Sequence, residues 1–227
     1  MSSLVLFDEQ FNAVPNSFSW QHPPKQWTVE NGKLRVEATE GSDNWCRTHY
    51  DWGIHDSAHF YYVEIPDDNQ NILIETKVTY FPHHQYDQAG LMIRRGPDSW
   101  VKTSCEYEVG EPARLGSVVT NHGFSDWATQ AYHVDSQITL SYRIYKYHTN
   151  DVCIMTNTTP DQSPDKWTQI RIARFFPLTP TDARDEGVAD GKLRVGLYFC
   201  GPLGPNFVAE FDYFKISVVE KNPSQWH

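Results

Sequence analysis

Five side chains that could bind a ligand or move a proton recur between residues 88 and 108. They are Gln88, Arg94, Lys102, Glu106 and Glu108. Because successive side chains of a β-strand point to opposite faces, these even-numbered residues would gather on one surface of an extended hairpin. Gly90 on the same face is expected to leave room above the backbone. Both a ligand-facing surface and an ordinary solvated strand face are consistent with this pattern.

Aromatic side chains outside the hairpin could complete a binding site. Trp45, Tyr86 and Trp127 would provide flat apolar platforms, and Arg143 would add a charged hydrogen-bond donor. Sugars suit this mixture because their hydroxyl groups make charge-assisted hydrogen bonds while the C–H face of the ring stacks on an aromatic side chain. The first hypothesis is therefore a module that binds a carbohydrate or a sugar-related metabolite.

Glu106 and Glu108 offer a second chemistry, the hydrolysis of a glycosidic bond by paired carboxylates. The run from Glu106 to Glu111 resembles the Glu-x-Asp-x-x-Glu strand of concanavalin-like glucanases, with Glu108 in place of the aspartate. Lys102 and Arg94 are expected to keep Glu106 ionised, which favours binding over proton donation. Hydrolysis is therefore the alternative hypothesis.

The sequence predicts neither a metal nor a cofactor. His83 and His84 are adjacent, so on an extended segment they point apart, and only with Asp87 would they form a conceivable set of ligands. No loop has a calcium-binding spacing, and neither a glycine-rich phosphate loop nor a nucleophile elbow occurs. The four cysteines form no C-x-x-C pair, which predicts reduced and mostly buried thiols.

Alternation of apolar residues predicts the hairpin that positions these groups. Its first strand runs from Gln88 to Arg94, the cluster 95–99 forms a turn, and the second strand starts at Trp100. The odd-numbered side chains of both strands are expected to face a core. They are Ala89, Leu91, Ile93, Val101, Thr103, Cys105, Tyr107 and Val109.

The rest of the chain also alternates and has no convincing amphipathic helix. Asn31-Gly32 is a two-residue hairpin signal, residues 122–127 are expected to form a loop that places Trp127 at a rim, and 137–148 is the longest strand. About twelve strands predict an all-β, two-sheet antiparallel jelly-roll sandwich forming a single domain over residues 1–227. The other expected strands are 4–7, 27–30, 33–38, 60–65, 72–80, 115–121, 152–155, 167–176, 192–200 and 207–219.

Charge and terminal sequence narrow the class of partner and the location. The formal net charge is −10 and no basic run occurs, which argues against nucleic acid and an anionic membrane surface as partners. The first residues lack the basic region of a signal peptide, and no apolar stretch is long enough to cross a membrane. These features predict a soluble, cytoplasmic protein.

One string resembles a known family. The residues Tyr86-Asp87-Gln88-Ala89-Gly90-Leu91-Met92, followed by Trp100-Val101-Lys102 and Glu106, are similar to the regulation-of-enolase-1-like family, named after a yeast protein. The resemblance covers about residues 18–218, and further matches are Trp45 with Thr48 and Tyr50, then His59. Two segments depart from the family pattern, 156–166 and 177–191.

The resemblance implies a concanavalin A-like lectin or glucanase sandwich and adds Thr48, His59 and Asp87 to the candidate ligand-binding residues. The family name alone implies a protein partner such as a metabolic enzyme. Because one sandwich fold carries sugar binders, glycosidases and interaction modules, the resemblance leaves the function open. The best hypothesis is a non-catalytic binding or regulatory protein with a polar and aromatic pocket on one sheet.

Overall fold

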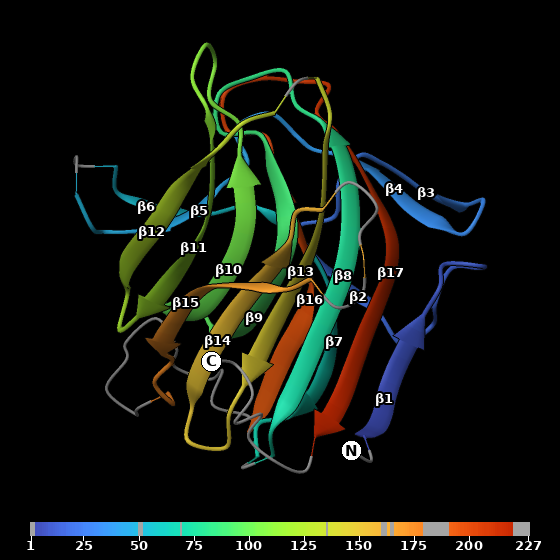
Figure 1. Cartoon of the computed structure of the whole chain (residues 1–227), viewed down its shortest axis with the longest axis vertical. Helices are drawn as coiled ribbons and strands as arrows, with labels where there is room; N and C mark the ends of the chain where they lie inside the picture. Colours follow the sequence, from blue (N-terminus) through green and yellow to red (C-terminus); the bar gives the residue numbers. More distant parts are fainter. Residues whose placement is uncertain are drawn as a thin grey trace.

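Two large antiparallel sheets form the body of the molecule. The computed structural model describes residues 3–49, 52–68, 70–134, 136–159, 163, 166–178 and 191–219. Figure 1 shows the two sheets stacked face to face, with a short strand pair beside the more distant one. Every strand pair among the described residues is antiparallel. The predicted all-β, two-sheet jelly-roll sandwich is thereby confirmed.

The first sheet has eight strands and the second has seven. In spatial order the first contains β15 (Thr168–Arg174), β14 (Asp151–Asn157), β13 (Ile138–Lys146), β8 (Ile72–Phe81), β17 (Val208–Val219), β4 (Lys33–Glu37) and β3 (Gln26–Glu30), with β1 (Ser3–Glu9) also paired to β17. The second contains β12 (Phe124–Tyr132), β11 (Ala113–Asn121), β10 (Ser99–Glu106), β9 (Gln88–Gly96), β16 (Lys192–Cys200), β7 (His59–Pro66) and β2 (Ser19–Gln21).

A third layer, which sequence reasoning missed, lies against the outer face of the seven-stranded sheet. It is a pair of three-residue strands, β5 (Asn44–Cys46) and β6 (Ile54–Asp56). Beneath it Trp45 and Cys46 pack with Met92 and Trp100 into a second apolar cluster. The even-numbered face of the central hairpin is therefore largely buried, whereas the sequence predicted a surface open to ligand or solvent.

The central hairpin is confirmed, with β9 and β10 joined by Pro97 and Asp98. Ala89, Leu91, Ile93, Val101 and Cys105 are fully buried in the main core between the sheets. The second strand is shorter than predicted.

Two expectations about this hairpin are wrong. Strand β10 ends at Glu106, and Val109 lies beyond it with 60% of its surface exposed. Gly90 does not make room for a ligand. A Cβ atom there would collide with the carbonyl oxygen of Thr103, so glycine permits the close approach of β9 to β10.

Two hairpin turns that contain glycine can be compared with the sequence predictions. The first was predicted correctly and the second was not. Asn31 and Gly32 both have positive φ angles, 54° and 70°, as a two-residue turn between β3 and β4 requires. His122 and Gly123 have 52° and 76° and make the same kind of turn. Strand β12 therefore begins at Phe124, and the predicted loop over 122–127 is wrong.

The four cysteines are free and buried, as predicted. The described residues include no helix long and apolar enough to span a membrane. Tyr50 and residues 160–162, 164–165 and 179–190, to which several of the predictions apply, lie outside the described residues.

Arg95 holds the two sheets together at the end of β9 that is remote from Gln88. Its guanidinium, 1% exposed, donates to both carboxylate oxygens of Asp67 at 2.5 and 3.1 Å and to Asn150 Oδ1 at 2.6 Å. It also donates to the carbonyls of Phe175 at 3.0 Å and Phe176 at 2.8 Å. Because several buried acceptors depend on its one planar cation, Arg95 stabilises the packing of the two sheets.

Replacing Arg95 with Met should therefore lower the free energy of unfolding by about 3 kcal/mol, since it leaves buried acceptors without their donor. Lysine should not restore stability, because a single ammonium cannot reproduce the planar fork of donors. The control is Arg35→Met, which removes an exposed ion pair of 3.8 Å and should cost less than about 1 kcal/mol. Denaturant unfolding of the three variants would measure this, and equal losses for Arg95→Met and Arg35→Met would contradict the role assigned to Arg95.

Candidate functional site

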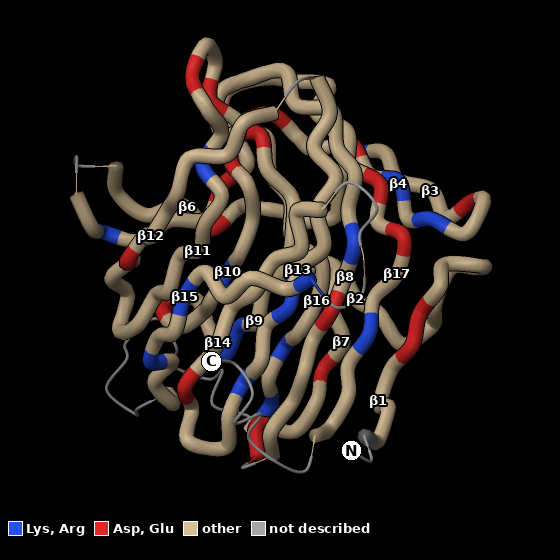
Figure 2. Tube along the Cα trace, in the orientation of Figure 1, with Lys and Arg blue, Asp and Glu red and all other residues tan. Residues whose placement is uncertain are grey.

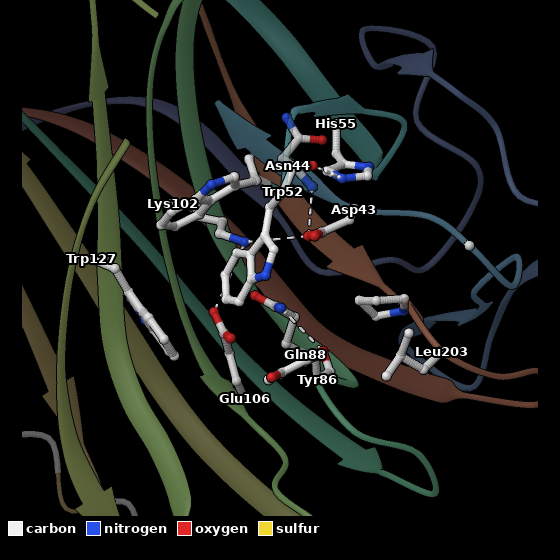
Figure 3. Close-up of a pocket in the computed structure, with 13 residues that line it drawn as sticks. Asp43, Asn44, Trp52, His55, Tyr86, Gln88, Lys102, Glu106, Trp127 and Leu203 are labelled. Atoms are coloured by element: carbon white, nitrogen blue, oxygen red, sulfur yellow. Dashed lines mark hydrogen bonds and ion pairs between the residues drawn. The ribbon is translucent and has the colours of Figure 1, made fainter. Parts of the chain in front are cut away.

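A cavity of about 200 Å³ lies on the outer face of the seven-stranded sheet, where the third layer covers it (Figure 3). Its floor comes from β9 and β10, and its walls come from the chain around β5 and β6, from β12 and from two loops. The residues that line it are Gly41, Asp43, Asn44, Trp45, Trp52, His55, Tyr86, Gln88, Lys102, Glu106, Trp127, Pro202 and Leu203.

Lys102 is the centre of the polar floor. The residue is 2% exposed, and its ammonium donates to the Tyr198 hydroxyl at 2.9 Å. It lies 3.8 Å from a carboxylate oxygen of Asp43 and 3.9 Å from one of Glu106. Burial alone would lower the pKa of Lys102, but these two carboxylates raise it above its usual value, so the ammonium stays charged.

Glu106 is the group whose charge depends on conditions near neutrality. Burial raises its pKa to about 7, and the opposing attraction of Lys102 does not cancel this effect. Desolvation therefore opposes the expected effect of the nearby cations, and the carboxyl group of Glu106 is partly protonated near pH 7. Arg94 does not contribute, since it is paired elsewhere.

Gln88 presents a fixed amide to the same floor. Its Oε1 accepts a hydrogen bond from the Ser104 hydroxyl at 2.9 Å, and its Nε2 donates to the Tyr86 carbonyl at 3.1 Å. Tyr86 has a positive φ of 69° and its N–H donates to the carbonyl of Tyr107 at 2.8 Å. These contacts preorganise the loop that enters β9.

Three tryptophans make the aromatic part of the walls. The indole N–H of Trp45 donates to the Thr48 carbonyl at 2.8 Å, which fixes the ring. Trp52, 39% exposed, stands edge-on to Trp45 with ring centroids 5.4 Å apart. In Figure 3, Trp127 and Leu203 lie at opposite sides of the pocket. A flat ring could thus meet aromatic surface while its polar groups reach the floor.

Arg94 fastens the third layer to the sheet instead of facing the pocket. Its guanidinium donates to both carboxylate oxygens of Asp56 on β6, each at 2.7 Å. On the other strand of the layer, the N–H of Cys46 donates to the Ser125 hydroxyl of β12 at 2.9 Å. These bonds hold Trp45 over the floor, so Arg94 positions the wall that lines the site.

The structure brings six of the predicted ligand-binding residues together around this cavity and places five elsewhere. The six that line it are Trp45, Tyr86, Gln88, Lys102, Glu106 and Trp127. The five that do not are Thr48, His59, Asp87, Arg94 and Arg143.

His59 and Asp87 have structural partners. The Nε2 of His59 accepts the N–H of Thr39 at 2.9 Å and its Nδ1 lies 2.5 Å from the His22 carbonyl, while burial lowers the pKa of the ring. One carboxylate oxygen of Asp87 accepts the backbone N–H groups of His83 and His84, both at 2.8 Å. Asp87 therefore orders the loop before β9. It contacts the backbone N–H groups of the two histidines.

Arg143 belongs to the other sheet. It pairs with Glu75 at 2.6 Å and stacks over the Trp167 ring, on the outer face of the eight-stranded sheet. Figure 2 shows acidic and basic residues interspersed along β8 and β17 on that sheet. Arg143 lies opposite to the inward side chains of β13, but alternation along one strand cannot tell which sheet contains that strand.

Glu108 lies outside the cavity, beyond the end of β10. Its carboxylate accepts the amide of Gln85 at 2.5 Å and lies 3.7 Å from Arg114. The carboxylate that does share the pocket with Glu106 is Asp43. Within the described residues, no group of three or more His, Cys, Asp and Glu side chains is arranged to hold a metal ion.

Sequence reasoning missed the residues that the third layer contributes. They are Asp43, Asn44, Trp52 and His55. The available signal was the concentration of tryptophan and polar residues between 43 and 55.

Comparison with known proteins identifies a family and a fold. A family model described as "Protein of unknown function (DUF1349)" matches residues 20–218. "Regulation of enolase protein 1" of Saccharomyces cerevisiae is 36% identical over 124 residues, which are 55% of this chain and 60% of that protein. The aligned region thus spans less than two thirds of this relative. The resemblance to the regulation-of-enolase-1-like family, which the sequence indicates, is confirmed.

Solved structures agree with the sandwich fold. A functionally unknown protein from Saccharomyces cerevisiae has a TM-score of 0.74 at 26% identity, covering 90% of this chain and 98% of that one. A xylan beta-1,4-xylosidase from Bacillus halodurans C-125 has a TM-score of 0.66 at 15% identity, covering 92% of this chain and 38% of the xylosidase. The second likeness concerns the fold alone.

Replacing Glu106 with Gln should change stability in a pH-dependent way. The carboxyl has an ordinary pKa of 4.5 and a folded pKa of about 7, so its contribution to folding is present below 4.5 and is lost as the pH rises through 7. Above pH 7 the wild type buries an ionised group at a cost on the order of 3 kcal/mol, which the amide avoids. We expect Glu106→Gln to be the more stable protein at pH 8 and to differ little from the wild type at pH 5.

Denaturant unfolding at both pH values would measure the difference. The matched control is Glu108→Gln, which removes a carboxylate two residues away and outside the cavity. A Glu106→Gln variant that is less stable than the wild type at pH 8 would contradict the raised pKa of Glu106.

Proposed function

The chain belongs to the DUF1349 family of proteins of unknown function, and from its pocket we propose that it binds a neutral carbohydrate or a sugar-related metabolite without transforming it. The observation that supports this most directly is the combination of a fixed polar floor with aromatic walls. Lys102 and Gln88 are held by Tyr198 and Ser104 before any ligand arrives. A ligand therefore meets groups already in place, which reduces the entropic cost of binding.

A sugar ring has polar hydroxyl groups and an apolar C–H face, and the cavity has partners for both. Its hydroxyl groups can accept from Lys102 and donate to Asp43 or Glu106, all of which line the cavity. Its C–H face can stack against Trp52 or Trp127. Burial of one apolar face together with charge-assisted bonds at the other supplies affinity and orientation.

The balance of charge favours a neutral ligand over a phosphorylated one. Lys102 is the cation among the lining residues with a fixed positive charge, and two carboxylates already flank it at 3.8 and 3.9 Å. A phosphate would meet Asp43 and Glu106 without a free positive partner, and like charges at short range repel. We therefore place neutral sugars ahead of sugar phosphates.

Hydrolysis is a second candidate, favoured by one observation. A carboxyl group with a pKa of about 7, as burial produces at Glu106, is suited to general acid catalysis at neutral pH. The partner carboxylate would be Asp43, because Glu108 lies outside the cavity. Release of the chromophore from a nitrophenyl glycoside, abolished by Glu106→Gln, would favour this candidate over simple binding.

The name of the yeast relative supports a third candidate, regulation of a metabolic enzyme through direct contact. Binding of purified enolase to this chain, measured by surface plasmon resonance, would favour it.

We also propose a cytoplasmic location, because the four cysteines are free and buried where an oxidising compartment would favour disulfides. Cell fractionation would test the location.

Trp127→Ala should weaken sugar binding by about tenfold or more while leaving the fold intact, because its half-buried ring lies on an edge strand. The experiment is a thermal-shift screen of neutral mono- and oligosaccharides, with sugar phosphates for comparison, followed by calorimetry on each hit. The control is Trp167→Ala, which removes a half-buried tryptophan from the opposite sheet.

A rise in melting temperature that depends on sugar concentration, lost in Trp127→Ala and kept in Trp167→Ala, would support the proposal. No shift with any sugar would refute it and leave the protein-partner candidate.

A further inference from the structure

A second cavity adjoins the first across the same tryptophans. It measures about 460 Å³ and is lined by Thr48, His49, Ser125 and Asp126 together with Trp45, Trp52 and Trp127, which also line the first. We propose that the two cavities form one elongated site, which takes a neutral oligosaccharide of at least two rings. This inference rests on the proposed function and specifies the length of the ligand.

The sizes of the cavities support a ligand longer than one ring. The first cavity, at about 200 Å³, is smaller than the roughly 300–1,000 Å³ typical of small-molecule sites. The second adds about 460 Å³ directly beside it and brings the combined site into that range. A single ring would leave most of this space to water.

The aromatic wall is placed to serve both cavities. The rings of Trp45 and Trp52 stand edge to face at 5.4 Å, so they present surfaces in different directions. Trp45 is fixed by its bond to the Thr48 carbonyl, and Thr48 itself lines the second cavity. Successive rings of an oligosaccharide could each meet an aromatic surface along this wall.

The polar groups of the second cavity are suited to a neutral ligand. The hydroxyl of Thr48 and the ring of His49 can exchange hydrogen bonds with sugar hydroxyls. The carboxylate of Asp126 is already paired with Arg171 at 2.8 Å, which leaves little net charge at this end. The predicted ligand residue Thr48, which lies outside the first cavity, is thereby placed within the elongated site.

Calorimetry with ladders of β-1,4-linked glucose and xylose, from monosaccharide to trisaccharide, tests this inference. We expect the trisaccharide of the preferred ladder to bind at least about tenfold more tightly than its monosaccharide, because the second ring gains aromatic contact. His49→Asn should reduce that ratio several-fold without changing the affinity for the monosaccharide. Asparagine is chosen because His49 has a φ of 57°, which asparagine tolerates.

The matched control is His122→Asn, since His122 also has a positive φ, 52°, and lines neither cavity. Equal affinity for monosaccharide and trisaccharide, or a ratio that His49→Asn leaves unchanged, would overturn the elongated site while leaving sugar binding intact. Absence of binding by either ladder in the wild type, together with no shift for any other neutral sugar, would overturn the proposed function itself.

Discussion

The buried charge of Lys102 is the constraint on which the site depends. The ammonium of a lysine that is only 2% exposed is stable only with carboxylates close by, since an unpaired buried ion costs several kcal/mol. One of its carboxylates, Glu106, is on the same strand, whereas the other, Asp43, comes from the segment that leads into β5. The ion pair between Lys102 and Asp43 therefore also holds the third layer against the sheet. The same enclosure raises the pKa of Glu106, chiefly because burial removes water from its carboxyl group and also because Asp43 lies nearby.

The sequence predicts the sandwich and the floor of the site well because both follow from local alternation. In β9 and β10 the odd-numbered residues enter the core and the even-numbered ones face the other way, as a period of two requires. Gln88, Lys102 and Glu106 are consequently found side by side. Residues on neighbouring strands of one hairpin are the contacts that pattern reasoning captures best.

The walls were harder to predict because they depend on contacts between distant parts of the chain. Strands β5 and β6 have three residues each, too few for a recognisable period, and they are held by Arg94 and Ser125 of the large sheet. The same limitation misplaced Arg143, because alternation along β13 cannot show that this strand belongs to the other sheet. The ionisation of Glu106 was misjudged because the sequence shows the neighbouring cations but does not show the degree of burial.

Most of the cover of the cavity comes from residues 41–49 and 52–55, and none of these described residues belongs to the main core between the sheets. The floor, in contrast, is part of the sandwich. The sandwich thus supplies most of the polar groups of the cavity floor, and the cover determines the shape of the cavity. Substitutions of the cover's exposed residues Trp52 and His55 would change the outline of the cavity with little consequence for folding of the sheets. A sandwich organised in this way is open to changes of specificity through a single short segment, much as exchangeable loops diversify recognition on a constant frame.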